Sequence, residues 1–287
     1  MKKVLLLFMA VCLLIFGCKK EEGVYNPDKK IKKILQGNDK RLQEEWTWNK
    51  DLLQKIDYYF GEDEVYYTEI FKYDSKNRII RIEDPEWGDY STISYNNDGY
   101  DKISYYDEEE LLMTAAFKYE KKKISRIDIT VYDFWGFDKT IKKDGFITKI
   151  IPKEIFINAS ECINRSGAKS EFTFTTNLKY NGDNVSETEM VLGPITIKSI
   201  SENYDKKLNP FYSSLNGFLD IGEGGVSGFG GYSKNNVGKV TSKYMNEEEV
   251  VEYTYTYEGK FPSSIQTQYS YERRINITYF EYCPVPK

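Results

Sequence analysis

The side chains best suited to chemistry in this sequence are carboxylates gathered around one tryptophan. Glu83, Asp84, Glu86 and Asp89 flank Trp87 in a short stretch that also holds a proline and a glycine. Two carboxylates at a suitable separation can act as the catalytic pair of a glycoside hydrolase. Acidic residues in β turns are more commonly just solvated. The stretch therefore predicts a turn, and a carboxylate-dependent hydrolase is the third of three alternative functions.

The sequence of 287 residues contains no histidine. This excludes histidine-based triads, histidine zinc sites and the most common general base. The glycine-rich stretch 222–231 lacks the Gly-Lys-Ser/Thr ending of a phosphate-binding loop and favours a plain loop instead. We therefore predict no catalytic residue, no metal site and no cofactor.

Two tryptophans lie beside loop signals and are candidates for ligand binding. Trp87 precedes Gly88, and Trp135 precedes Gly136. An exposed tryptophan presents a flat, amphipathic face that suits a sugar or a peptide side chain. Packing in the core or across strands is the alternative for each. Trp87 and Trp135 are therefore predicted as ligand-binding residues with that alternative open.

The N-terminus has the pattern of an export signal. Lys2 and Lys3 precede the apolar run Val4–Phe16, which is too short for a stop-transfer helix. The following Gly17-Cys18 resembles a bacterial lipobox, in which the cysteine is lipidated and becomes the first residue of the mature chain. We predict a signal peptide over residues 1–17 and a lipid anchor on Cys18, with an ordinary secretory signal as the alternative.

Residues 18–28 form the predicted lipidated cysteine and tether, because they are polar and lack periodicity. Lys19, Lys20, Glu21 and Glu22 resemble the export signal of surface-exposed lipoproteins in the Bacteroidota. The sequence thus predicts an outer-membrane lipoprotein displayed on the cell surface, with retention on the periplasmic face as the alternative. Its first predicted partner is the membrane, through the lipid anchor.

Charge and cysteine content limit the other partners. Loss of the two signal-peptide lysines changes the net charge from −5 to −7. Nucleic acid is excluded as a partner, because phosphate binding requires clustered Lys and Arg. Beyond the signal and anchor, Cys162 and Cys283 form an even pair that suggests a disulfide in an exported protein. Two unpaired thiols are the alternative.

Residues 29–287 are dominated by a recurring hairpin unit. Trp46-Thr47-Trp48 leads through a polar turn to Ile56, and similar pairs occur at Phe71–Tyr73, Ile93–Tyr95, Phe117–Tyr119 and Tyr255–Tyr257, with a degenerate copy at Leu178–Tyr180. In five of these six units the second aromatic residue lies eight positions before the closing residue. That constancy predicts one repeated turn geometry.

The repeats and the 25 tyrosines predict an all-β fold. We expect an antiparallel meander of repeated hairpins that forms a curved or coiled sheet across residues 29–287. A β-sandwich or a barrel is the alternative way to protect the sheet edges.

The stretch Tyr73–Ile82 is similar to a YD repeat of the Rhs type. Asn209–Phe211, Ser233–Val237, Tyr255–Tyr257 and Phe261–Ile265 look like the C-terminal signature of a Bacteroidota lipoprotein family of unknown function built from degenerate YD repeats. The resemblance implies a β-structured envelope protein and brings no assigned catalytic residues.

Together these patterns predict a lipid-anchored envelope protein that acts as a non-catalytic binding or interaction module for a glycan or a protein. The main alternative is a structural spacer or assembly component of the envelope.

Overall fold

The computed structural model describes residues 27–60, 64–132, 172–193, 195–212, 230–244, 247–270 and 275–284. Nearly all of them lie in antiparallel strands or short turns, as the all-β prediction requires. Among these residues no helix combines the length and the apolar character needed to cross a membrane.

The described residues form sixteen strands and one short 3-10 helix. They are β1 (Ile31–Gln36), β2 (Arg41–Asn49), β3 (Leu52–Phe60), β4 (Glu64–Tyr73), β5 (Ile79–Glu83), β6 (Tyr90–Tyr95), β7 (Tyr100–Asp107), β8 (Glu110–Glu120), β9 (Lys123–Val131), β10 (Phe172–Asn181), β11 (Asn184–Leu192), β12 (Ile195–Glu202), η1 (Gly230–Tyr232), β13 (Lys239–Tyr244), β14 (Glu247–Glu258), β15 (Phe261–Tyr269) and β16 (Ile275–Tyr282).

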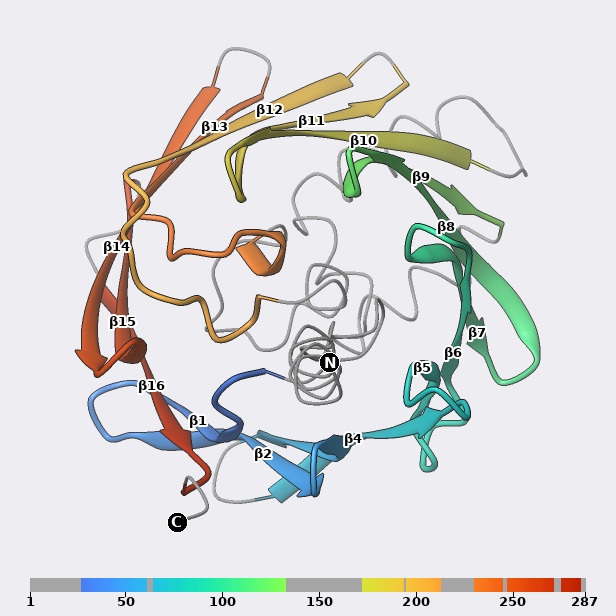
Figure 1. The fold of residues 1–287 in the computed structure, drawn as a ribbon, viewed down its shortest axis with the longest axis horizontal. Coiled ribbons are helices and arrows are strands. Elements are labelled where there is room, and N and C mark those ends of the chain that lie inside the picture. Colours follow the sequence, from blue (N-terminus) through green and yellow to red (C-terminus); the bar gives the residue numbers. More distant parts are fainter. Residues whose placement is uncertain are drawn as a thin grey trace, which may run out of the picture.

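These strands close into a single up-and-down barrel (Figure 1). Each strand pairs with the next in the chain, and β1 pairs with β16, for example at Ile34 and Phe280. The expected open, curved sheet is therefore wrong, and the barrel alternative is confirmed. Closure leaves no strand edge unpaired, which removes the tendency of edges to pair with other chains.

Six hairpins share one irregularity that explains the spacing of the repeat. In the first, Trp46 lies opposite Ile56 and Thr47 opposite Lys55, but Trp48 lies opposite Leu53. The second strand thus carries one extra residue, a β-bulge. A bulge reverses the alternation of side chains, so Leu53 and Ile56 both face the core although they are three positions apart.

The same register shift directly precedes the second aromatic residue of all six units. It lies between Thr47 and Trp48, Lys72 and Tyr73, Ser94 and Tyr95, Lys118 and Tyr119, Lys179 and Tyr180, and Thr256 and Tyr257. The predicted repetition of turn geometry is confirmed.

Aromatic residues near the ends of six even-numbered strands also tie these strands to their neighbours. Each of the six donates a hydrogen bond to a main-chain carbonyl near the start of the preceding odd-numbered strand. The bonds run from Trp48 Nε1 to Ile31 O (2.7 Å), Tyr73 Oη to Leu53 O (2.5 Å), Tyr95 Oη to Ile79 O (2.7 Å), Tyr204 Oη to Val185 O (2.6 Å), Tyr255 Oη to Val237 O (2.8 Å) and Tyr282 Oη to Pro262 O (2.7 Å).

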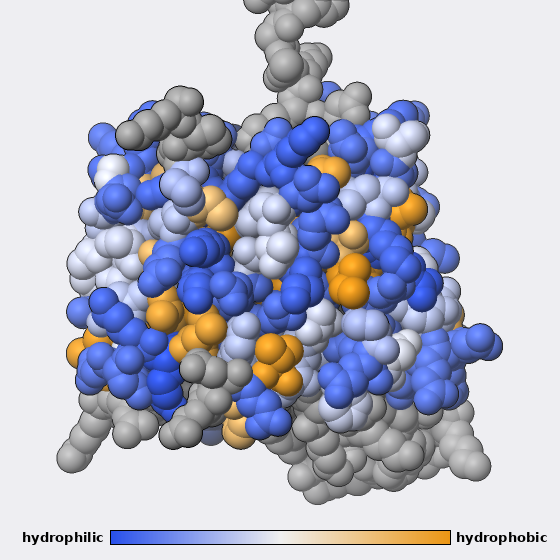
Figure 2. Space-filling model, turned by 90° about the horizontal axis from the view of Figure 1, so that it is seen from below, coloured by the Kyte–Doolittle hydropathy of each residue, from blue (hydrophilic) through white to orange (hydrophobic). Residues whose placement is uncertain are grey.

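Side chains alternate between a mainly apolar inner face, which also holds a few buried polar residues, and a polar outer face. On β8, Ala115 and Phe117 are 0% and 6% exposed, whereas Ala116 and Lys118 between and beside them are exposed. The face of the outer wall seen in Figure 2 is mainly hydrophilic, and the apolar residues on it are scattered and form no continuous band. The buried aliphatic and aromatic side chains therefore point to the inside of the barrel.

The meander gives the barrel two different ends. We call the end where β1 begins and β16 finishes the turn end; it carries the tight turns 50–51, 121–122, 182–183 and 259–260. We call the opposite end the loop end; among its connections is the β5–β6 turn, residues 84–89. The β12–β13 connection starts and finishes at the turn end, and its described residues, 203–212 and 230–238, lie within the ring of strands in the view down the barrel (Figure 1).

Candidate functional site

The β5–β6 turn at the loop end presents Trp87 to solvent. Asp84 is 2% exposed, and its Oδ1 accepts hydrogen bonds from the backbone N–H groups of Glu86 (2.7 Å) and Trp87 (3.1 Å). Its Oδ2 accepts a bond from the backbone N–H of Thr68 on β4 (3.2 Å). Gly88 completes the turn with a φ of +80°, a conformation that side-chain-bearing residues rarely adopt. The buried carboxylate thus fixes the turn that carries the exposed indole.

Trp87 belongs to a group of aromatic side chains that we call the aromatic patch: Phe60, Tyr66 and Trp87. Phe60 is 78% exposed and Trp87 is 45% exposed. The Phe60 and Tyr66 rings meet edge to face, with centroids 6.1 Å apart, and Trp87 Nε1 lies 3.4 Å from the carbonyl oxygen of Tyr66. The exposure of Trp87 argues against the alternative of core packing, and its role in ligand binding stays a prediction.

The four carboxylates of this stretch do not all converge on one point, although burial and the nearby carboxylates of Asp84 and Asp89 together raise the pKa of both Tyr67 and Tyr105. Glu83 faces the outer wall, where it pairs with Lys72 (2.5 Å) and Arg81 (2.7 Å), and the hydrogen bond from Lys72 holds the pKa of its carboxyl below the usual value. Asp84 is occupied by backbone N–H groups. Glu86 is exposed on the turn itself. Glu83 thus forms part of the outer wall, and Asp84 stabilises the turn.

On the inner face, several buried acids meet tyrosine and tryptophan donors. Asp89 Oδ2 accepts a hydrogen bond from Tyr105 Oη (3.0 Å), and Glu69 Oε2 accepts one from Tyr58 Oη (2.8 Å). Burial, reinforced by the Glu69 carboxylate, raises the pKa of Tyr58 well above its ordinary value, so this phenol stays protonated. Among the described residues, no group of three or more acidic or cysteine side chains has the arrangement of a metal site.

The outer wall carries ion pairs on several neighbouring strands. Asp128 on β9 binds Lys118 (3.1 Å) and Arg126 (2.6 Å), and Glu187 on β11 binds Lys179 (2.8 Å) and Lys198 (3.0 Å). The outward rows of a barrel embedded in lipid are apolar, because a Lys or Arg there costs about 2–4 kcal/mol at the midplane. An outer face that carries ion pairs of this kind is compatible with contact with water.

We call the described parts of the β12–β13 connection, residues 203–212 and 230–238, the plug. Phe211 in the plug packs against Phe280 of β16, with ring centroids 5.7 Å apart. Tyr232 in the plug is buried. The plug thus contacts the inner face of the wall.

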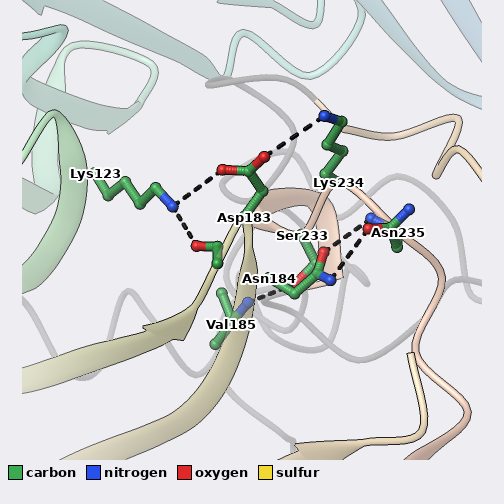
Figure 3. Close-up of polar contacts among 8 residues, drawn as sticks. Lys123, Asp183, Asn184, Val185, Ser233, Lys234 and Asn235 are labelled. Atoms are coloured by element: carbon green, nitrogen blue, oxygen red, sulfur yellow. Dashed lines mark hydrogen bonds and ion pairs between the residues drawn. The ribbon is translucent and has the colours of Figure 1, made fainter. Parts of the chain in front are cut away.

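The plug is fixed to the β10–β11 turn by a set of polar contacts (Figure 3). Val185 N donates to Ser233 Oγ (3.0 Å), and Asn235 N donates to Asn184 Oδ1 (3.0 Å). Asp183 lies between Lys123 (3.2 Å) and Lys234 (3.5 Å). Its hydrogen bond and charge interaction with Lys123 hold the pKa of Asp183 below the ordinary value.

Asp205 organises the other side of the plug. Its carboxylate accepts hydrogen bonds from Lys207 N (2.9 Å), Asn236 N (3.2 Å), Asn236 Nδ2 (3.1 Å) and Tyr257 Oη of β14. Burial and this hydrogen bond raise the pKa of Tyr257. Two segments of the family-like C-terminal signature also meet in the plug. Asn209 of one segment donates hydrogen bonds to the carbonyl oxygens of Ser233 and Lys234 in the other.

Several predicted sites lie outside the described residues: Cys18, the four residues 19–22, Trp135 and Cys162. Cys283 follows β16 and forms no disulfide within the described part of the chain, so its predicted bridge to Cys162 stays a prediction. Sequence reasoning missed Phe60 and Tyr66. Their signal in the sequence was an aromatic run on each side of Gly61-Glu62-Asp63.

No protein-family model and no curated protein matches this chain. Among solved structures, it is similar to a porin-like protein from Bacteroides uniformis ATCC 8492, with 12% identity and a TM-score of 0.52 over 90% of this chain and 98% of that one. A porin-like protein from Bacteroides vulgatus ATCC 8482 matches with 10% identity and a TM-score of 0.32, over 90% of this chain and 100% of that one. The chain therefore shares the barrel fold of the Bacteroides uniformis protein.

Proposed function

We propose that this chain is a tethered, water-facing β-barrel of the bacterial cell envelope that acts as a non-catalytic binding module. The observation that carries the binding role is the aromatic patch at the loop end, where Phe60 and Trp87 are 78% and 45% exposed. Exposed rings of this size are costly to leave in water and mark contact surfaces. Asp84 holds the turn beneath Trp87 and so keeps the surface preformed.

The outer wall supports a barrel that stands in water beside the membrane. A diffusion pore of sixteen strands has lipid-facing apolar rows outside and polar rows inside. Here the order is reversed, because Lys118 and Arg126 point outward while Phe117 and Ile127 are buried inside. The plug at the turn end is a further obstacle to passage through the barrel.

Attachment to the envelope then depends on the lipid proposed for Cys18. β1 begins at Ile31, so a short tether connects the proposed anchor to the turn end of the barrel. The loop end, with the aromatic patch, is the opposite end of the same strands. This placement supports the patch as the surface that meets a ligand away from the membrane.

The chemistry around the patch favours a glycan over a protein ligand. Glu64 and Glu86 are exposed and adjoin the patch in sequence. Ionised carboxylates are acceptors only, and they suit the many hydroxyl donors of a sugar. The rings of the patch offer flat faces against which the C–H faces of a sugar can pack.

Trp87→Ala is expected to weaken glycan binding at least thirtyfold, since a central buried indole in an interface contributes about 2 kcal/mol or more. The measurement is binding to a panel of immobilised bacterial and host polysaccharides, with affinity then determined for each polysaccharide that binds. The thermal midpoint should change little, because Trp87 is exposed.

Tyr132→Ala is the matched control, because Tyr132 is 40% exposed and lies outside the patch. Its affinity should equal that of the wild type. Equal loss in the two variants, or unchanged binding by Trp87→Ala, would remove the patch as the binding surface. A barrel that binds no polysaccharide but captures a protein ligand through Trp87 would replace the glycan with a protein partner.

A further inference from the structure

The two ends of the barrel carry opposite charge. The described connections at the turn end contain eleven Lys and Arg residues against six Asp residues and no Glu. Those cations are Lys29, Lys30, Lys50, Lys76, Arg78, Lys121, Lys122, Lys206, Lys207, Lys234 and Lys260. The excess lies on a chain whose net charge is −5. It is therefore a property of this end and not of the whole molecule.

The loop end shows the reverse balance within the part of the chain that the structure describes. Its connections contain one cation, Lys40, against six acids. Those acids are Asp39, Asp84, Glu86, Asp89, Glu108 and Glu109. The barrel thus has a basic end and an acidic end, separated by the length of its strands.

Many of the turn-end lysines are not used in holding the fold together. Lys30 pairs with Asp51, and Lys234 pairs with Asp183. In contrast, five exposed lysines from five separate connections have no ion pair among the described residues: Lys50, Lys76, Lys121, Lys206 and Lys260. Four of these lysines lie in short turns that follow one another around the barrel, and Lys206 lies in the plug at the same end. We call these five residues the lysine rim.

We propose that this lysine rim docks on the anionic headgroups of a lipid surface. The inference deepens the proposed function, because the tether from Cys18 enters the barrel at the same end. Residues 19–30 span at most about 40 Å when extended, so the rim stays close to the surface in which the anchor lies. A single acyl chain binds a membrane only marginally, and a basic patch is a common second signal.

Docking through the rim also orients the barrel. Contact between the turn end and the membrane places the acidic loop end farthest from the anionic surface. The negative charges of the headgroups repel the acidic residues of that end. The strands then stand upright on the membrane, and the aromatic patch with Trp87 points away from it. The rim and the acidic end thus act together, one attracted and the other repelled.

The test uses the mature chain from residue 18 with Cys18→Ala, so that no lipid contributes to binding. Sedimentation with vesicles of phosphatidylglycerol and phosphatidylcholine is compared with sedimentation with pure phosphatidylcholine vesicles. The rim variant replaces Lys50, Lys76, Lys121, Lys206 and Lys260 with Gln. A lysine near an anionic surface is worth about a fivefold change in partition, so loss of three or more contacts lowers binding about 100-fold.

The control variant removes the same charge elsewhere, replacing with Gln five cations of the loop end and wall: Lys40, Arg41, Lys55, Lys198 and Lys243. We expect it to bind anionic vesicles within about threefold of the parent, and both variants to keep the parent circular dichroism spectrum. Equal losses in the two variants, equal binding of the parent to both vesicle types, or no binding of the parent at all would overturn the proposal. None of these results depends on lipidation or on the aromatic patch, so the proposed function is tested separately.

Discussion

Ala115→Lys is expected to lower the free energy of unfolding by about 4 kcal/mol or more, whereas Ala116→Lys is expected to change it by less than about 0.5 kcal/mol. The two residues are neighbours on β8, but Ala115 is 0% exposed and Ala116 is exposed. Ala115 lies opposite Ile103 and Ile129, both buried, so an ammonium group there loses its water without gaining a partner.

The pair is its own control, because both variants add the same side chain and the same charge to one strand. Urea unfolding followed by circular dichroism gives both free energies. If Ala116 faced lipid, its replacement with Lys would cost about 2–4 kcal/mol near the midplane. A large loss at Ala116 with a small one at Ala115 would mean that the two faces of the wall have been assigned the wrong way round.

Asp205→Ala is expected to detach the plug, with a loss of about 2–4 kcal/mol in docking free energy. The carboxylate accepts hydrogen bonds from Lys207, Asn236 and Tyr257, and hydrogen bonds to a charged group contribute about 1.5–3 kcal/mol each before non-additivity. Amide hydrogen exchange should accelerate in residues 203–212 and 230–238. The central wall strands should exchange as in the wild type, because their ladder does not depend on Asp205.

Tyr257→Phe separates the hydroxyl from the ring in the same experiment. It keeps the aromatic packing but removes one of the donors to Asp205, so the increase in plug exchange should be smaller, corresponding to about 1 kcal/mol. Uniform acceleration across wall and plug would mean that the two unfold as one unit. Unchanged exchange in Asp205→Ala would show that Asp205 does not hold the plug.

The hairpin repeat could be predicted because its cause is local. The first residue of each unit, aromatic or aliphatic, lies opposite the closing position across the hairpin, as Phe117 lies opposite Ile127. The bulge then accounts for the eight-residue spacing found in five of the six units. The longer interval from Tyr73 to Ile82 comes from a longer turn at residues 74–78, as its spacing indicated. Repeated local geometry leaves a repeated pattern in the sequence.

Closure of the sheet could not be predicted, since it depends on contacts between the ends of the chain. β1 and β16 pair across the whole sequence, and neither strand differs in composition from an edge strand of an open sheet. The repeat at Tyr204 and the one at Tyr282 were also missed. Their first positions, Glu202 and Phe280, precede a long connection and the end of the barrel instead of a hairpin turn.

The candidate site, like the fold, could be predicted from the sequence only in part. Trp87 was predicted because a tryptophan beside proline and glycine suggests an exposed turn. Phe60 and Tyr66 were not, because their exposure depends on how β3 and β4 meet the turn at residues 84–89. The buried role of Asp84 was equally hidden, since only the folded turn directs backbone N–H groups at its carboxylate.

Likeness to a porin-like barrel leaves open which medium surrounds the wall, because strand pairing is the same in water and in lipid. Side-chain chemistry supports the proposed water-facing wall. Outward ion pairs such as Asp128 with Lys118 and Arg126, set against inward Ile127 and Phe117, describe a barrel that is inverted relative to a lipid-embedded one.

The most direct measurement is phase partition of the mature chain with and without Cys18→Ala, between water and a detergent that separates on warming. We expect the Cys18→Ala chain to remain in the aqueous phase with its β-sheet circular dichroism intact. The wild-type chain from bacterial membranes should enter the detergent phase through its lipid. Recovery of folded Cys18→Ala protein in the detergent phase would contradict a water-facing wall.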